Sequence, residues 1–246
     1  MEDEKVIAKL LEHYRHPNIV EVVDTDHEEG IYLRRYHTIS LHGLPTSQPR
    51  RLMWYQDILC GLVHLHDLGI AHSDLRLDNI LHDEAERAVI ADFSAASQFG
   101  QPTFAPSQPN FPVPIIGLAR EISDATDRFA LGSLIYTCEY GKGPEMAIVD
   151  DGSLSLPPLT AGPKSLDAII QSAWLGKYDA TRQMLLDVES LNICDDLSSR
   201  SDQLQLTPRE LLRERVLQWR SNREAEHGCI LYALPTEDQI HQAQSP

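Results

Sequence analysis

The stretch that decides the fold is HSDLRLDN at residues 72–79, with DFS following at residues 92–94. Between these motifs lie short apolar runs at 79–82 and 88–92, which flank a polar turn. Two short apolar runs joined by a polar turn are typical of a β-hairpin. The sequence therefore predicts a hairpin whose open end brings the two motifs together.

Three oxygen-bearing side chains of these motifs should converge on one point. If residues whose numbers sum to about 171 face each other across the hairpin, Asn79 meets Asp92 at its open end. Asp74 lies five residues before Asn79, in the loop that leads into the same hairpin. Carboxylate and amide oxygens suit Mg²⁺, which also binds phosphates, so the arrangement favours phosphoryl transfer. Taken alone, each of the three residues is better explained as one that caps a turn, and it is their combined spacing that favours a site.

Much of the remaining chain has the apolar spacing of helices. Gly69 follows the strongest of these patterns, where a left-handed C-cap is expected, and Ser123 or Asp124 is the expected N-cap of another. The helices are predicted at 3–14, 50–68, 124–140, twice within 165–191, and from a capping box at 207–210 to about 224.

Strands and loops fill the segments between the helices. Strands are expected at 19–24 and 30–36, on either side of an acidic turn at 26–29. The segment 100–114 contains five prolines and predicts an irregular loop. The last twenty residues are expected to form a partly ordered tail.

The composition excludes several classes of protein. Thirty-seven acidic residues against twenty-one basic ones give a net charge of −16, which repels nucleic acid and anionic lipid. The N-terminus resembles no signal peptide, and no apolar run approaches the roughly 18 residues of a membrane span. The cysteines form no C-x-x-C pair and are expected to be free thiols in the cytoplasm or nucleus. They are Cys60, Cys138, Cys194 and Cys229.

The eleven histidines suggest a metal site only at first sight. His13 with His16, and His64 with His66, have the spacing of paired ligands, but neither pair has a third ligand at a recognisable distance. The H-E-x-x-H motif is absent, so zinc is not expected. His64 and His66 are interpreted as surface or interface residues of the helix at 50–68.

The motifs together resemble those of the eukaryotic-type protein kinase family. A D-x-x-x-x-N loop followed by a hairpin that ends in an aspartate is similar to the family's catalytic loop and D-F-G segment. HPNIV at 16–20 resembles the turn after the family's helix C. ARE at 119–121 resembles the end of the activation segment, and DRFALG at 127–132 the start of helix F.

The resemblance implies a role for each matching residue. Asp74 is the implied catalytic base, and Arg76 the implied cation for the γ-phosphate of ATP. Asn79 and Asp92 are the implied Mg²⁺ ligands, and Glu4 is the best match to the nucleotide-side glutamate of helix C.

Further implied roles are structural. His72 is implied to shape the loop, and Asp127 to hold the backbone of the catalytic loop from helix F. Glu121 is implied to pair with a later arginine that the sequence does not identify.

The implied fold is α+β, with a mainly helical large lobe and a small lobe reduced to one helix and about two strands. The expected division is a small-lobe remnant at 1–40, a large lobe at 41–225 and a tail at 226–246. The large lobe contains the catalytic loop 72–79 and the activation segment 92–121. The implied reaction is serine/threonine-type transfer of phosphate from ATP to a protein hydroxyl.

The sequence also departs from the family pattern. The glycine-rich loop and the ATP-binding lysine belong ahead of helix C, yet the first predicted helix begins almost at Met1. The two remaining strands leave an edge that we expect a partner or a missing segment to cover. Ser73, Ser94 and Arg120 replace the arginine of H-R-D, the glycine of D-F-G and the proline of A-P-E.

Three functional hypotheses follow. The first is a protein kinase whose nucleotide lobe is missing from this sequence, which argues against strong ATP binding by the chain alone. The second is a pseudokinase that binds a protein partner as a scaffold. The third is a small-molecule phosphotransferase of the aminoglycoside or choline kinase type, which the motifs at 16–20, 119–121 and 127–132 disfavour.

Overall fold

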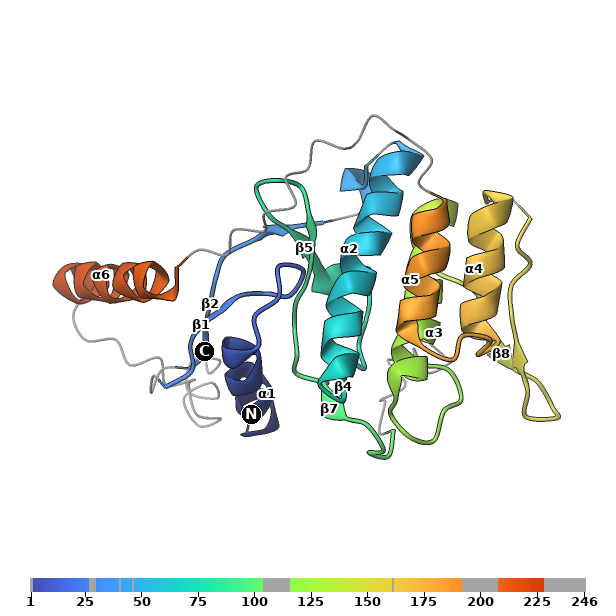
Figure 1. The fold of residues 1–246 in the computed structure, drawn as a ribbon, viewed down its shortest axis with the longest axis horizontal. Helices are drawn as coiled ribbons and strands as arrows, with labels where there is room; N and C mark the ends of the chain where they lie inside the picture. Colours follow the sequence, from blue (N-terminus) through green and yellow to red (C-terminus); the bar gives the residue numbers. More distant parts are fainter. Residues whose placement is uncertain are drawn as a thin grey trace, which may run out of the picture.

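The computed structural model describes residues 2–26, 30–39, 41–45, 47–103, 116–160, 162–191 and 208–227. The fold is a mixed α+β arrangement of helices and small sheets (Figure 1). Its α-helices are α1 (Glu2–His13), α2 (Gln48–Asp67), α3 (Asp124–Tyr140), α4 (Lys164–Trp174), α5 (Thr181–Ser190) and α6 (Arg209–His227). Short 3₁₀ turns are η1 (Leu41–Gly43) and η2 (Leu77–Asn79).

The strands are short and pair locally. They are β1 (Val22–Asp24), β2 (Tyr32–Leu33), β3 (His37–Thr38), β4 (Ile70–Ala71), β5 (Ile80–His82), β6 (Ala88–Ile90), β7 (Ser97–Gln98), β8 (Ala147–Ile148) and β9 (Leu154–Ser155). The described sheets are β1-β2, β3-β5-β6, β4-β7 and β8-β9.

The helical part of the described chain is built around α2 and α3. Helices α2, α5 and α4 stand side by side in Figure 1, and α3 packs against α4. Leu59, Leu62 and Leu65 of α2 are each 0% exposed. Burying a leucine side chain contributes about 1.5–3 kcal/mol, so this apolar face fixes α2 at the centre of the core.

Local signals set the ends of these helices. Ser123 is the N-cap of α3, where its hydroxyl accepts a hydrogen bond from the Ala125 amide and Thr126 completes a capping box. Gly69 has a φ of 73°, and its amide donates to the His66 carbonyl after α2. Both predicted helices are therefore confirmed, and the N-cap of α3 is Ser123 rather than Asp124.

The predicted hairpin forms, but the pairing of its two strands is shifted by one residue from the expected register. Ile80 pairs with Ile90 and Leu81 with Val89, so paired residue numbers sum to 170. The Ala91 amide donates to the Asn79 carbonyl at 2.9 Å, so Asn79 faces Ala91 and Asp92 lies one residue further on. The turn fixes this register, because the Asp83 carboxylate accepts two backbone amides across it.

Within residues 1–40 the described part of the chain forms helix α1 and strands β1, β2 and β3, and β3 pairs with β5 of the hairpin rather than with β1 or β2. β1 and β2 form an antiparallel pair, with α1 packed against β1. The turn before β1 joins this N-terminal segment to the hairpin, because the Val20 amide donates to the Ile90 carbonyl and the Ile90 amide to the Asn18 carbonyl. The Asn18 side chain also donates to the Ala88 carbonyl at 3.0 Å.

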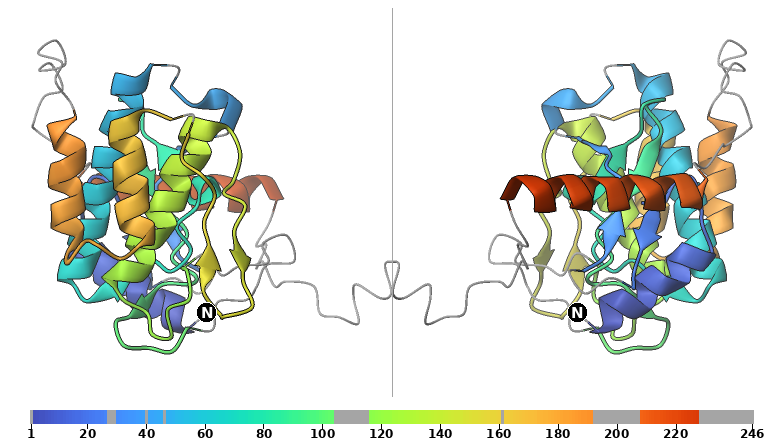
Figure 2. Two further views of the ribbon diagram at one scale, coloured as in Figure 1. Left: turned by 90° about the vertical axis from the view of Figure 1, so that its right-hand side faces the viewer. Right: turned by 90° about the vertical axis from the view of Figure 1, so that its left-hand side faces the viewer.

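Helix α6 packs against β1, in the N-terminal part of the chain. It lies beside β1 and β2, away from the α2–α5 bundle (Figures 1 and 2). Arg213 donates to the Val23 carbonyl and to the buried Glu12 carboxylate at 2.9 Å, and Arg209 also pairs with Glu12. The chain's own helix α6 thus contacts the two-stranded sheet for which a covering partner or a missing segment was expected.

Two of the predicted free thiols are found in the described residues. Burial raises the pKa of the Cys60 thiol to about 11 and that of Cys138 to about 12, so both stay protonated near neutral pH. No helix in the described residues is long and apolar enough to cross a membrane.

Several predicted features lie outside the described residues. They are Cys194, Cys229, most of the turn at 26–29, most of the proline-rich segment at 100–114, the cap residue Thr207 and nearly all of the tail at 226–246.

Candidate active site

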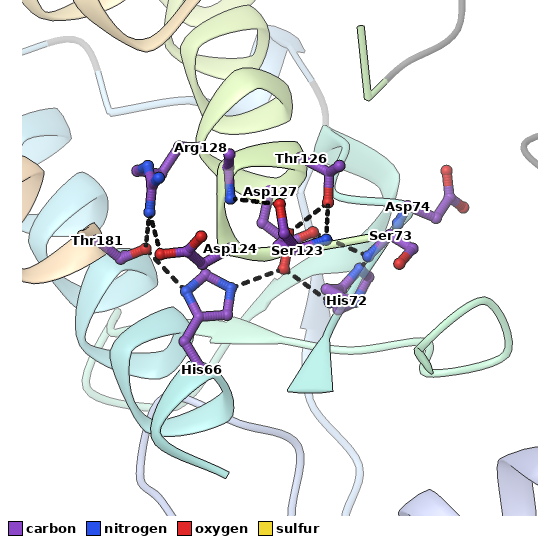
Figure 3. A network of polar contacts seen from close by, with 11 residues as sticks. His66, His72, Ser73, Asp74, Ser123, Asp124, Thr126, Asp127, Arg128 and Thr181 are labelled. Carbon is purple, nitrogen blue, oxygen red and sulfur yellow. Dashed lines mark hydrogen bonds and ion pairs between the residues drawn. The ribbon is translucent and has the colours of Figure 1, made fainter. Parts of the chain in front are cut away.

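The loop at 72–79 is held from beneath by Asp127, in the first turn of α3. The His72 amide donates to Asp127 Oδ2 at 2.7 Å, and the Ser73 amide donates to Oδ1 at 2.9 Å. Asp127 is 0% exposed, so both bonds form away from water (Figure 3). The expected role of Asp127 as the anchor of the loop backbone is therefore confirmed.

His66 belongs to the same network, which the sequence reasoning missed. Its Nε2 lies 2.9 Å from Asp127 Oδ2 and its Nδ1 lies 2.8 Å from Thr181 Oγ1. With the proton on Nε2, His66 donates to Asp127 and Nδ1 accepts from the Thr181 hydroxyl. His66 follows the buried Leu59 and Leu62 by seven and four residues. This helical spacing was the signal that His66 faces the core rather than the surface.

His64 differs from His66 and fits the expectation of an exposed or interface residue. Its Nε2 lies 2.8 Å from the Tyr14 carbonyl, and its ring stacks on His16 with centroids 4.9 Å apart. The described residues contain no group of three or more histidine, cysteine or acidic side chains that could hold a metal.

The network determines the charge state of Asp127. Burial by itself raises the pKa of this carboxyl. The hydrogen bond from His66, the electrostatic attraction of the His66 and His72 rings and the backbone amide of His72 together outweigh burial and hold the pKa below its ordinary value. Asp127 is therefore an ionised acceptor, and its bonds to the loop are of the stronger, charge-assisted kind.

A buried arginine extends the network to α5. Arg128 donates to the Tyr178 carbonyl at 3.0 Å and to Thr181 Oγ1 at 3.3 Å, and it pairs with Asp124. Because Thr181 also contacts His66, helices α2, α3 and α5 meet under the loop through one set of polar contacts (Figure 3). The loop is thus supported by three elements of the large lobe.

Asp74 and Asn79 are brought together, as the sequence predicts. Asn79 Nδ2 donates to the Asp74 carbonyl at 2.8 Å and to Asp74 Oδ2 at 3.0 Å. The Asp74 side chain points away from the Asp127 network in Figure 3 and is half-buried. The residue before it, Ser73, has a φ of 65°, a left-handed conformation that costs on the order of 1–3 kcal/mol outside glycine. The Asp127 bond offsets that cost and keeps Asp74 oriented.

His72 has the structural role that the resemblance implies. It is 0% exposed, and its Nε2 lies 2.9 Å from the Ala91 carbonyl. Its Nδ1 accepts from the Asp74 amide at 3.3 Å, and its ring meets the buried Phe93 edge-on. His72 therefore ties the loop to the segment that carries Asp92.

Asp92 lies at the end of the hairpin but contacts a different partner from the one expected. It is exposed, with a φ of 62°. Its Oδ1 accepts from the Ser94 hydroxyl at 2.7 Å and from the Ser94 amide at 3.2 Å. Asp92 is next to Ala91, whose amide bonds to the Asn79 carbonyl, so the backbone places Asp92 one residue beyond the contact with Asn79.

Arg76 and Glu4 occupy less central positions. Arg76 pairs with Asp78 in the same loop, and its side chain is 34% exposed. No hydrogen bond or ion pair joins Glu4 to the loop in the described part of the chain. Among the α1 side chains that the structure describes, the buried carboxylate is Glu12, which is 4% exposed.

The donor set fits a hard cation. Asn79 commits its amide nitrogen to Asp74, so its Oδ1 is left as an acceptor. Asp92 Oδ1 accepts the two hydrogen bonds from Ser94, and Asp92 Oδ2 is the second hard oxygen that could bind a cation. Mg²⁺ is bound through few protein oxygens together with substrate phosphates, and these two side chains match that chemistry.

Comparison with known proteins places the chain in a family. The family described as "Protein kinase domain" matches residues 5–155, and the chain belongs to it. The chain is 28% identical over 153 residues to serine/threonine-protein kinase GRIK1 of Arabidopsis thaliana. The aligned segment covers 57% of this chain and 39% of that protein. It is 32% identical over 118 residues to rhodopsin kinase GRK1 of Homo sapiens. This second aligned segment covers 45% of this chain and 21% of that protein.

A third relative matches the chain over a shorter segment. Serine/threonine-protein kinase ppk8 of Schizosaccharomyces pombe is 35% identical over 95 residues, which cover 36% of this chain and 18% of that protein. The matched segment is therefore less than half the length of each of these relatives. Protein kinases as a family use ATP with Mg²⁺ and act on proteins.

Proposed function

We propose that residues 72–94 form the phosphoryl-transfer site of a serine/threonine-type protein kinase, which transfers phosphate from ATP to a protein hydroxyl. The observation that carries the proposal is the fixed orientation of Asp74, which is held by Asn79 on a loop anchored to Asp127. The names of the similar proteins, which are serine/threonine kinases in two of the three cases above, support the same reaction.

In this proposal Asp74 accepts the proton of the attacking hydroxyl. Its carboxylate is half-buried, and Asn79 holds Oδ2, so Oδ1 is the atom that faces the substrate. Arg76 is the cation nearest to it in sequence and is proposed to meet the γ-phosphate after leaving Asp78. A positioned base of this kind contributes about 10²–10⁴-fold to a rate.

The proposed metal ligands are Asn79 and Asp92. When bound, Mg²⁺ supplies positive charge that neutralises the phosphates of ATP. Asn79 immediately precedes β5 and Asp92 lies two residues after β6, so the hairpin restricts their relative position. Glu4 stays a proposal for the nucleotide side of the site.

A second candidate is a scaffold protein that keeps the kinase fold without transferring phosphate. The observation that favours it is the ion pair between Arg76 and Asp78, which neutralises the cation proposed for the γ-phosphate. In this case the large lobe presents a surface to a protein partner and the site binds no nucleotide.

Thermal unfolding with MgATP distinguishes the two candidates. At five times Kd, binding adds about 1 kcal/mol to the free energy of unfolding, which raises Tm by about 2–4 °C in a chain of this size. We expect such a shift in the native chain and its loss in Asp92→Asn. The matched control Asp67→Asn changes an exposed carboxylate of α2 and should keep the shift. No shift at millimolar MgATP supports the scaffold, and an equal shift in Asp92→Asn contradicts the proposed metal ligand.

A further inference from the structure

Ser94 stands where the family pattern has glycine, and it is bonded to the neighbouring acidic residue of the same motif. Its hydroxyl donates to Asp92 Oδ1 at 2.7 Å and its amide donates to the same oxygen at 3.2 Å. Glycine supplies the amide but not the hydroxyl. The serine therefore adds a second donor to the one carboxylate oxygen.

The backbone makes this contact stable. Phe93 and Ala96 are both buried, and the Ala96 amide donates to the Phe93 carbonyl at 3.1 Å, which closes a turn around Ser94. The left-handed residue of the segment is Asp92, with a φ of 62°, whereas Ser94 has no positive φ. A serine thus fits this position without backbone strain, and its hydroxyl is held within reach of Asp92.

Asp92 has no other support of this kind in the described residues. It is exposed, and the recorded hydrogen bonds of its side chain are the two from Ser94. An exposed carboxylate with a single backbone donor is free to turn about its side-chain torsions. Two donors on Oδ1 restrict the rotation of the carboxylate and leave Oδ2 available as an acceptor.

We propose that Ser94 is a positioning residue that orients the Asp92 carboxylate so that Oδ2 faces the divalent cation. The inference rests on the proposed function, because it takes Asp92 as a metal ligand. Carboxylates that bind metals are themselves hydrogen-bonded, and removing such a second partner costs about 10–100-fold in metal affinity. Ser94 supplies that partner from the same motif.

Binding of Mn²⁺ to the full chain, followed by the electron paramagnetic resonance signal of the free ion, tests the inference without measuring activity. We expect Ser94→Ala to weaken Mn²⁺ affinity by about 10-fold. Ser94→Thr keeps the hydroxyl and should restore the affinity to within about twofold of the native value. The matched control Ser97→Ala removes a nearby hydroxyl whose hydrogen bond within the described residues is to the Ala95 carbonyl, at 3.5 Å, and should leave Mn²⁺ affinity unchanged.

The outcomes separate this inference from the proposed function. Equal or tighter Mn²⁺ binding by Ser94→Ala overturns the role of Ser94, while loss of binding in Asp92→Asn still supports the metal site. Unchanged binding in Asp92→Asn, or no binding to the native chain, contradicts both. If circular dichroism shows that Ser94→Ala misfolds, the pair Ser94→Gly and Ser94→Thr decides: weaker binding by the glycine variant alone supports the inference, and equal binding by both overturns it.

Discussion

Replacing Asp127 by asparagine tests the network that supports the proposed active site. Asp127 accepts three hydrogen bonds, one from Ser73 on Oδ1 and two from His72 and His66 on Oδ2. Asparagine has one acceptor oxygen, and its amide nitrogen must face a donor in place of the other oxygen. In the less costly orientation the oxygen keeps His72 and His66, and the Ser73 amide is left unpaired.

The magnitude follows from these contacts. A buried unpaired amide costs about 1–3 kcal/mol. Each of the two remaining bonds loses its charged acceptor, which is a loss of about 1 kcal/mol per bond. The sum is a decrease of about 3–5 kcal/mol in the free energy of unfolding, a large part of the about 5–15 kcal/mol that is typical of a folded protein.

Urea denaturation, followed by circular dichroism and tryptophan fluorescence, measures this decrease. The matched control is Asp124→Asn, which removes one negative charge from the same first turn of α3. Asp124 is partly exposed and Arg128 keeps its bonds to Tyr178 and Thr181, so we expect a loss of at most about 1 kcal/mol. A loss below about 1 kcal/mol for Asp127→Asn, or one equal to that of the control, would refute the reasoning.

The pKa of Asp127 adds a dependence on pH to the same experiment. Because its folded pKa lies below its ordinary value, the stabilisation is complete above the unfolded pKa of about 3.9 and is lost as the pH falls through the folded pKa. In Asp127→Asn, the free energy of unfolding should therefore decrease less steeply than in the native chain as the pH falls below about 3.9. A variant that loses stability with acid as steeply as the native chain contradicts the assigned pKa.

Two further predictions concern the small lobe. Burial, and then the charge of His64, lowers the pKa of His16 to about 4, so the unfolded chain takes up a proton first as the pH falls below the ordinary value of 6.5. Stability should decrease as the pH falls from about 6.5 to about 4. Measured as Tm against pH, this decrease should be less steep in His16→Asn, and an unchanged slope contradicts the lowered pKa of His16. Arg213→Ala removes a hydrogen bond to the buried Glu12 and should lower the free energy of unfolding by about 1–3 kcal/mol in urea, whereas the exposed control Arg215→Ala should have little effect. Equal effects of the two arginine variants would show that α6 is not anchored through Glu12.

The features that local sequence determines were predictable. A helix end depends on a few consecutive residues, so the capping residue Ser123 and the left-handed Gly69 could be located from the chain alone. The spacing of Asp74 and Asn79 is also local, and it correctly predicted that the two side chains meet. The hairpin was predicted with a register that differs by one residue from the observed one, because the turn is set by bonds of Asp83 that the apolar pattern does not reveal.

Contacts between distant segments were beyond the reach of pattern reasoning. His66 and Asp127 are 61 residues apart, and Arg213 and Glu12 are 201 apart. No short pattern links such residues, because their meeting depends on how whole helices pack. The position of α6 against β1 and the burial of Glu12 rather than Glu4 follow from that packing.

Transfer of phosphate from radiolabelled MgATP to a basic protein rich in serine and threonine tests the central claim most directly. A basic acceptor suits the chain, whose net charge is −16. The account predicts Mg²⁺-dependent labelling by the native chain that falls by at least about 100-fold in Asp74→Asn, while the MgATP-induced rise in Tm stays unchanged. Labelling that survives Asp74→Asn, or native chain that binds MgATP but transfers no phosphate, would contradict it.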